Sequence, residues 1–93
     1  MPGYMYILKC ADGSYYVGST KYLEKRIQQH QSGEGAKHTN KHGPVELVYF
    51  EKFSRIDHAF YREHQIKKWT RRKKEALIFG EIDALKEFAK KEF

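Results

Sequence analysis

Residues 4–18 read Tyr-Met-Tyr-Ile-Leu-Lys-Cys-Ala-Asp-Gly-Ser-Tyr-Tyr-Val-Gly, and this stretch decides how the chain folds. Aromatic and β-branched residues dominate its two halves, which favours two short strands on a half-buried sheet. Asp12-Gly13 separates the halves, and Asp-Gly between two such runs is a strong hairpin signal. The stretch therefore predicts a β-hairpin around which the remaining elements pack.

The length of the turn decides which side chains share a face of this hairpin, because a shift of one residue turns every side chain over. A two-residue turn at residues 12–13 would place Tyr6 and Tyr16 on opposite faces. A three-residue loop at residues 11–13 would place them on one face, with Gly18 opposite Tyr6. We favour the three-residue loop because Ala-Asp suits the right-handed positions and glycine follows where a left-handed residue is required.

Two phenols beside a glycine gap resemble a functional site, although these residues alone favour the simpler explanation of an aromatic-rich sheet face. The opposite face of the hairpin is expected to form the core, with the side chains of Met5, Ile7, Tyr15 and Val17.

Composition indicates one small globular domain over residues 1–93, with 40% hydrophobic and 32% charged residues. No apolar run approaches membrane-spanning length, and the N-terminus carries no apolar signal segment. We therefore expect a cytoplasmic protein with no membrane partner. Cys10 is the one cysteine, so an internal disulfide and a cysteine-based zinc site are excluded, and we interpret it as a strand residue.

Positive charge is concentrated in the second half of the chain. The formal charge is +6, and residues 51–80 carry 9 basic and 4 acidic groups. A basic cluster of this kind favours a polyanionic partner, although a solvated helix face has the same pattern. The predicted phosphate contacts in this region are Lys67, Lys68, Arg71, Arg72, Lys73 and Lys74.

A polar segment at residues 32–44 is long for a loop in a domain of this size, and long ordered loops tend to be functional. Lys37 and Lys41 are residue types that contact phosphate, so we add them to the predicted nucleic-acid-binding residues. His38 and His42 are spaced as a possible metal-binding pair, but this signal is weak.

A helix is predicted over residues 22–31, with Leu23 and Ile27 as its apolar stripe. Arg26 and His30 are also four residues apart, on a neighbouring stripe, so both are expected at the edge of the buried face. Side chains at such an edge usually extend to solvent, and they gain interest only beside an anion.

The third strand is predicted at residues 45–53, with apolar residues on both faces, as in a central or covered strand. Ser54 and Asp57 resemble a capping box for a helix that reaches about residue 69. Its apolar stripe is Ile56, Ala59, Phe60 and Ile66.

The same helical period places Glu63 on the inward stripe of this helix. A buried carboxylate costs several kcal/mol unless it is paired or binds a cation. Two explanations remain open: Arg62, Lys67 or a tyrosine hydroxyl pairs with Glu63, or Glu63 is a ligand for a divalent metal.

Two more helices complete the prediction. Thr70 is expected to cap a helix over about residues 71–79 that ends at Gly80, and residues 81–93 form an amphipathic covering helix.

Five side chains from separate elements are suited together to metal-assisted phosphodiester hydrolysis: Tyr6, Tyr16, Arg26, His30 and Glu63. A carboxylate holds the ion, which stabilises the leaving oxygen and lowers the pKa of water. An arginine stabilises charge on the phosphoryl group, and a phenol near the metal can accept a proton from water. We assign the base role to Tyr6 and a positioning role to Tyr16.

These residues resemble the motifs of the GIY-YIG nucleases. Residues 4–6 stand at the first motif and residues 16–18 match the second, while residues 22–30 resemble the helix that carries the family's arginine and histidine. Glu63 stands where the metal-binding glutamate is expected. Residues 16–20, 44–49 and 66–69 resemble the small stand-alone bacterial members, and the resemblance covers about residues 4–80.

The resemblance implies an α/β (α+β) fold, with a small three-stranded antiparallel sheet flanked by helices. The sequence departs from the family pattern in places. Tyr4 and Met5 replace the first motif's glycine and isoleucine, Ser19 stands where some members have lysine, and Tyr22 stands where asparagine or aspartate often caps the helix.

The resemblance implies a Mg²⁺- or Mn²⁺-dependent endonuclease that acts on DNA, structure-selective and linked to DNA repair or processing, with RNA as a second possible substrate. The alternative is a catalytically weak nucleic-acid-binding module on the same fold. Because the chain has no room for a separate DNA-reading domain, a protein partner is a possible source of specificity.

Overall fold

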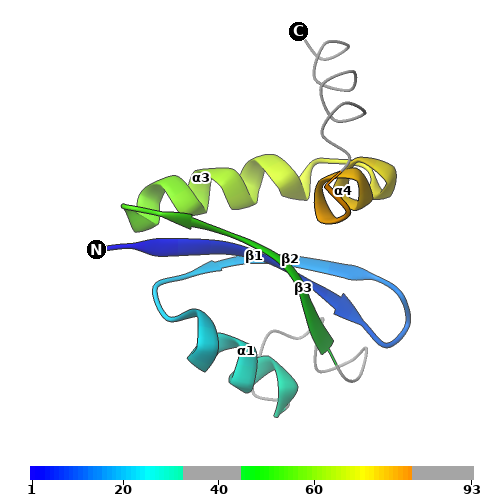
Figure 1. The fold of residues 1–93 in the computed structure, drawn as a ribbon, viewed down its shortest axis with the longest axis horizontal. Helices are drawn as coiled ribbons and strands as arrows, with labels where there is room; N and C mark the ends of the chain where they lie inside the picture. Colours follow the sequence, from blue (N-terminus) through cyan, green and yellow to red (C-terminus); the bar gives the residue numbers. More distant parts are fainter. Residues whose placement is uncertain (33–44, 81–93) are drawn as a thin grey trace, which may run out of the picture.

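The computed structural model describes residues 1–32 and 45–80. In this part of the chain, three strands form one antiparallel sheet in the order β2-β1-β3. Helix α1 covers one face of the sheet, and α3 and α4 lie on the other (Figure 1). The elements are β1 (Gly3–Cys10), β2 (Tyr15–Thr20), α1 (Leu23–Gln31), β3 (Val45–Phe53), α3 (Ile56–Lys67) and α4 (Arg71–Ile78). The predicted fold class is confirmed.

The hairpin contains the predicted three-residue loop. Gly13 has a φ of 87°, and its N–H donates to the Cys10 carbonyl at 2.9 Å, while the Cys10 N–H donates to the Ser14 carbonyl at 2.8 Å. Tyr6 therefore pairs with Gly18, and Tyr6 and Tyr16 lie on the same face, as predicted.

The face of the sheet toward α3 and α4, which we call the core face, carries the main apolar cluster. Met5, Ile7 and Ile66 are fully buried in it, and Val17 is nearly so. Burial of each such side chain contributes roughly 1.5–3 kcal/mol. The face toward α1, which we call the α1 face, has a second cluster of Tyr6, Leu8, Cys10 and Val45, with Leu23 and Ile27 packed against it.

A β-bulge allows β3 to cover both faces although it lies at the edge of the sheet. The register shifts between Ile7, which pairs with Tyr49, and Leu8, which pairs with Leu47. Val48 and Tyr49 consequently both pack on the core face, and Leu47 packs on the α1 face. β3 is therefore an edge strand whose side chains pack on both faces of the sheet, and not a central strand.

The limits of α3 differ from the prediction. Its N-cap is Arg55, with no side-chain capping bond, so the predicted Ser54 cap is wrong; Asp57 instead accepts a hydrogen bond from Arg55 Nε at 3.1 Å. Phe60 was placed on the apolar stripe but is 51% exposed, because the buried side of α3 passes through Ala59, Glu63 and Ile66.

Helix α4 begins as predicted, since the Thr70 hydroxyl accepts a hydrogen bond from the Lys73 N–H at 3.2 Å. Gly80, with a φ of 72°, follows its C-terminal end. The predicted helix at residues 81–93 lies outside the described residues. None of the helices described in residues 1–32 and 45–80 has the length and apolarity needed to span a membrane.

Candidate active site

Tyr6 lies at the centre of the α1 face and is only 1% exposed. Its ring projects over Gly18 on the edge strand β2. A Cβ atom at position 18 would lie 2.5 Å from the Tyr6 hydroxyl oxygen, which is far inside van der Waals contact. Gly18 is therefore required for the close approach of the phenol to the sheet.

His30 reaches Tyr6 from the last turn of α1, with its Nε2 atom 3.0 Å from the Tyr6 hydroxyl. It is 2% exposed, so the prediction that it lies at the edge of the buried face is wrong. Burial lowers the pKa of His30 to about 4, and the positive charge of Arg26 adds to this effect. The imidazole is consequently uncharged at neutral pH.

Tyr16 completes a cluster of three rings on this face. Its ring centroid lies 5.1 Å from that of His30 and 6.4 Å from that of Tyr6. Tyr16 is half-buried, whereas Tyr6 is fully enclosed. Tyr16 is thus the more accessible of the two phenols.

Arg26 lies half-buried beside both phenols. Its hydrogen bond to the Tyr6 hydroxyl raises the pKa of Arg26, and a further one to Tyr16 acts in the same direction. Its Nη1 atom also donates to Gln29 Oε1 at 3.1 Å. A cavity of about 190 Å³ opens at this guanidinium, which can therefore meet an anion such as phosphate.

The environment of Tyr6 argues against the base role that we assigned to it. Burial raises the pKa of Tyr6 to about 12, and the nearby charges of Arg26 do not offset this rise. A phenol with such a pKa stays protonated at neutral pH and is a poor base. Tyr6 is better suited to donate a hydrogen bond and to hold its neighbours in place.

Glu63 approaches the same edge of the sheet from the core face. It is 7% exposed, so its predicted inward position is confirmed. The Ser19 hydroxyl donates to Glu63 Oε1 at 2.5 Å, and the Lys67 ammonium lies 2.6 Å from Oε2. Lys67 is therefore one of the partners that the sequence analysis proposed for Glu63. Arg62, another proposed partner, binds Glu51 instead, at 2.9 and 3.2 Å.

The predicted residues do not all share one face. Tyr6, Tyr16 and His30 gather on the α1 face, whereas Glu63 lies beyond β2 on the core face. The charge of Glu63 nevertheless contributes to the raised pKa of Tyr6, so the two groups are electrostatically coupled around Gly18 and Ser19. The candidate site therefore lies at the β2 edge of the sheet and includes residues from both faces.

The chemistry at Glu63 is compatible with a weakly held divalent ion. No group of three His, Cys, Asp or Glu residues suited to a metal occurs within the described residues, so Glu63 would be the single carboxylate ligand. Mg²⁺ commonly uses one or two carboxylates, with water and phosphate oxygens in the remaining positions. Lys67 already places a cation against this carboxylate, and its side chain is 47% exposed, so it can move away.

The predicted phosphate-contacting residues differ in their exposure to solvent. Lys68 and Arg72 are exposed, and Arg71 is exposed but donates to the Gly13 carbonyl at 2.7 Å. Lys73 is only 4% exposed, with its ammonium 4.5 Å from the Trp69 ring centroid, so we withdraw it from this set. Burial also lowers the pKa of Lys74, which is half-buried. Lys37 and Lys41 lie outside the described residues.

Two residues at the site were not predicted from the sequence. Ser19 was noted only as a departure from the family pattern, although strand alternation puts it on the face opposite Gly18 and therefore toward α3. Gln29, which accepts from Arg26, lies three residues further along the same helix, and that spacing was the available signal.

Comparison with known proteins identifies the family of this chain. Residues 2–76 match the model of the GIY-YIG catalytic domain. A UPF0213 protein from Clostridium perfringens is 56% identical over 75 residues, which cover 81% of each chain. A UPF0213 protein from Bacillus pumilus is 51% identical over 75 residues, which cover 81% of this chain and 76% of the relative.

Solved structures agree with this assignment. The solution NMR structure of a UPF0213 protein from Bacillus halodurans has a TM-score of 0.55 at 45% identity, covering 84% of this chain and 83% of that one. The solution NMR structure of a protein from E. faecalis has a TM-score of 0.59 at 40% identity, covering 86% and 85%. The chain therefore belongs to the GIY-YIG family of nuclease domains.

Proposed function

We propose that this protein is an endonuclease that hydrolyses phosphodiester bonds of DNA and depends on Mg²⁺ or Mn²⁺. The observation that carries the proposal is the buried Glu63 carboxylate at the same sheet edge as Arg26 and the two phenols. A protein that only binds nucleic acid has no need of an inward carboxylate beside that cluster.

In this proposal, Arg26 binds the phosphate to be cut, and its charge stabilises the phosphoryl oxygens as the attacking oxygen approaches. The cavity beside its guanidinium supports this role. A divalent ion at Glu63 would activate water and stabilise the leaving oxygen. Ser19 orients the carboxylate through its hydrogen bond, and Lys67 is released from the carboxylate and becomes available to the phosphate backbone.

In this mechanism Tyr16 first loses its hydroxyl proton to solvent, and the resulting phenolate accepts the proton of the attacking water. Tyr16 is more accessible than Tyr6, and it lies beside the Arg26 guanidinium that would hold the phosphate. Tyr6 stays protonated because its pKa is about 12, and it holds the uncharged His30 at 3.0 Å. These roles replace the original assignment of the two tyrosines.

The test is a cleavage assay with Mg²⁺ or Mn²⁺ on single-stranded, duplex, nicked and branched DNA. Glu63→Gln is expected to reduce cleavage about a hundredfold or more and to keep DNA binding. Glu75→Gln, on α4, is the matched control and should cleave like the wild type. Unchanged cleavage by Glu63→Gln would contradict the proposal.

A second function, that of a nucleic-acid-binding module with weak catalysis, is favoured by the short Glu63–Lys67 ion pair, which already compensates the buried carboxylate. Binding through Lys67, Lys68, Arg71 and Arg72 predicts a loss of roughly 0.9 log units of affinity per contacted phosphate for each decade of salt. Salt-dependent binding without cleavage on every substrate would favour the module. Selectivity for DNA structure, action on RNA, a role in repair and a specificity-giving protein partner remain predictions of the sequence.

A further inference from the structure

A groove on the α1 face lies outside the ring cluster of the candidate site. Alternation along β1 and β3 turns Tyr4, Phe50 and Lys52 toward this face, since Lys52 pairs with Tyr4 and Phe50 with Tyr6. The segment that leads into α1 forms the facing wall. The groove encloses about 590 Å³, and its chemistry is set by Tyr4, Tyr22, Phe50, Lys21, Lys25 and Lys52. We call it the aromatic groove.

The aromatic side chains of this groove leave ring surface open to solvent. Tyr22 is 61% exposed and Phe50 is 51% exposed, while the Tyr4 ring supports Phe50 at a centroid distance of 6.2 Å. Planar ring faces that are supported on one side and open on the other are the usual platforms for stacking of nucleobases.

The charge of the groove complements a phosphate backbone. Lysines 21, 25 and 52 line it, and among the described residues Glu24 is the one acidic residue on its walls. Aromatic faces combined with surrounding cationic side chains distinguish sites for single-stranded nucleic acid from simple apolar docking surfaces.

The groove also continues toward Arg26. The smaller cavity of about 190 Å³ at Arg26 shares Tyr22 and Lys25 with the aromatic groove. A strand with one phosphate at Arg26 can therefore extend its neighbouring nucleotide past Lys25 and onto Tyr22.

We propose that the aromatic groove binds an unpaired nucleotide of a DNA strand. In a duplex each base is stacked on both faces by its neighbours, so only an unpaired base can stack on Tyr22 or Phe50. The volume of the groove lies within the range of about 300–1,000 Å³ that is typical of small-ligand sites. The position of this nucleotide next to the cut phosphate rests on the proposed function, whereas binding itself does not.

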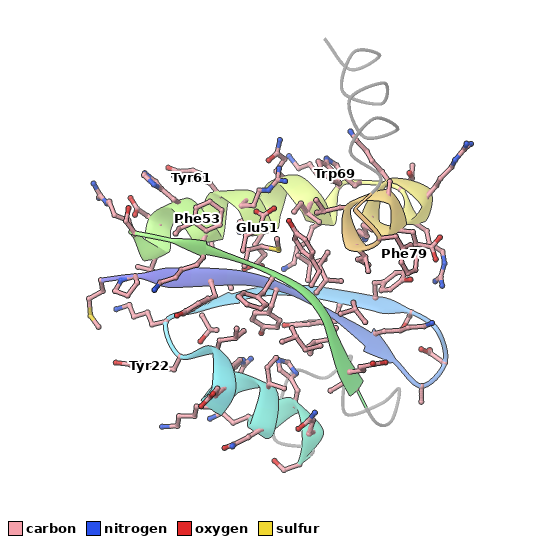
Figure 2. All side chains as sticks on the ribbon, in the orientation of Figure 1. Tyr22, Glu51, Phe53, Tyr61, Trp69 and Phe79 are labelled. Carbon is pink, nitrogen blue, oxygen red and sulfur yellow. The ribbon has the colours of Figure 1, made fainter. Side chains whose placement is uncertain are left out.

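Binding is measured by fluorescence anisotropy in EDTA, so that no cleavage occurs, with the full chain and two probes. One probe is a labelled oligothymidine strand, and the other is a duplex of the same length. The variants are Tyr22→Ala and Phe50→Ala, and Tyr61→Ala is the matched control. Figure 2 shows Tyr22 beside the start of α1 and Tyr61 on α3, across the sheet, where Tyr61 is 72% exposed.

Tyr22→Ala and Phe50→Ala are each expected to weaken binding of the single strand about tenfold and to leave duplex binding within about twofold. A strand with 2-aminopurine should show quenching by the wild type that Tyr22→Ala reduces. Thermal melting of each variant verifies folding, and Tyr22→Ala removes only an exposed side chain.

Wild-type affinity in both groove variants, or an equal loss in Tyr61→Ala, would overturn the proposal and indicate a different occupant of the groove. Cleavage assays on the same proteins separate this inference from the proposed function. Groove-dependent binding without cleavage at any metal concentration would contradict the nuclease mechanism and leave the groove assignment intact.

Discussion

The two faces of the small sheet bury different kinds of side chains. The core face buries Met5, Ile7 and Ile66 completely, in an apolar cluster under α3. The α1 face buries a tyrosine and an uncharged histidine that are bonded to each other, with an arginine at their edge. Helices close both faces, and burial raises the pKa of a tyrosine on each of them, Tyr6 on the α1 face and Tyr49 on the core face. The buried, uncharged His30 lies on the α1 face.

This difference indicates that the two faces of the one sheet have different roles. Apolar burial on the core face stabilises the fold, and Val17 anchors there the strand that carries Gly18 and Ser19. The polar cluster on the α1 face is less favourable to bury, because each polar group must find a partner. The core face also carries charged groups, since Glu63 is buried at its edge and Glu51 pairs there with Arg62.

The largest expected effect on stability comes from the core face. Ile66→Ala leaves a cavity in the cluster of Met5, Ile7 and Val17, and it should lower the free energy of unfolding by about 2–5 kcal/mol. Denaturant unfolding followed by Trp69 fluorescence measures this change. Cleavage per folded molecule should stay unchanged below the melting transition, and a specific loss of cleavage would contradict the division between the faces.

The buried histidine predicts a pH dependence that belongs to the α1 face. The pKa of His30 is about 4 in the folded state and about 6.5 in an unfolded chain, so the unfolded state binds more protons between these values. Stability is therefore complete above pH 6.5 and falls as the pH drops toward 4, by up to about 3 kcal/mol.

Denaturant unfolding of the wild type and of His30→Gln over this pH range isolates the contribution of His30, because other titrating groups are common to both proteins. The difference in unfolding free energy should change between pH 6.5 and pH 4. A difference that is constant with pH would show that His30 titrates normally.

Gly18→Ala tests the close approach of Tyr6 to the edge strand. The added Cβ would lie 2.5 Å from the Tyr6 hydroxyl and 2.6 Å from its ring carbon Cζ, so the enclosed phenol has to shift. We expect a loss of about 1–3 kcal/mol in unfolding free energy and a loss of cleavage in molecules that remain folded. A variant with wild-type cleavage would refute the requirement for Tyr6 at this position.

The smallest effect is expected from a polar contact on the core face. The Tyr49 hydroxyl donates to Glu51 at 2.6 Å, and Arg62 pairs with the same carboxylate. Tyr49→Phe removes one of these partners and should cost about 1 kcal/mol, with no change in cleavage. Tyr61→Phe, at an exposed position, is the control and should stay within about 0.5 kcal/mol of the wild type.

Local sequence was sufficient to predict the hairpin and the inward position of Glu63. The Asp-Gly turn and the two-residue period of the strands determined the shared face of Tyr6 and Tyr16, and the helical period located Glu63. These features depend on residues within a few positions of one another, so they can be inferred without the fold. The resemblance to the GIY-YIG nucleases then connected residues that are distant in sequence.

The partners of those residues were decided by the tertiary structure alone. The Tyr6–His30 bond joins residues 24 positions apart, and the Ser19–Glu63 bond joins residues 44 positions apart. Neither pairing follows from a local period, because it depends on how helices dock on the two faces of the sheet. The burial of His30, which lowers its pKa, and the enclosure of Tyr6, which raises its pKa, arise from the same packing.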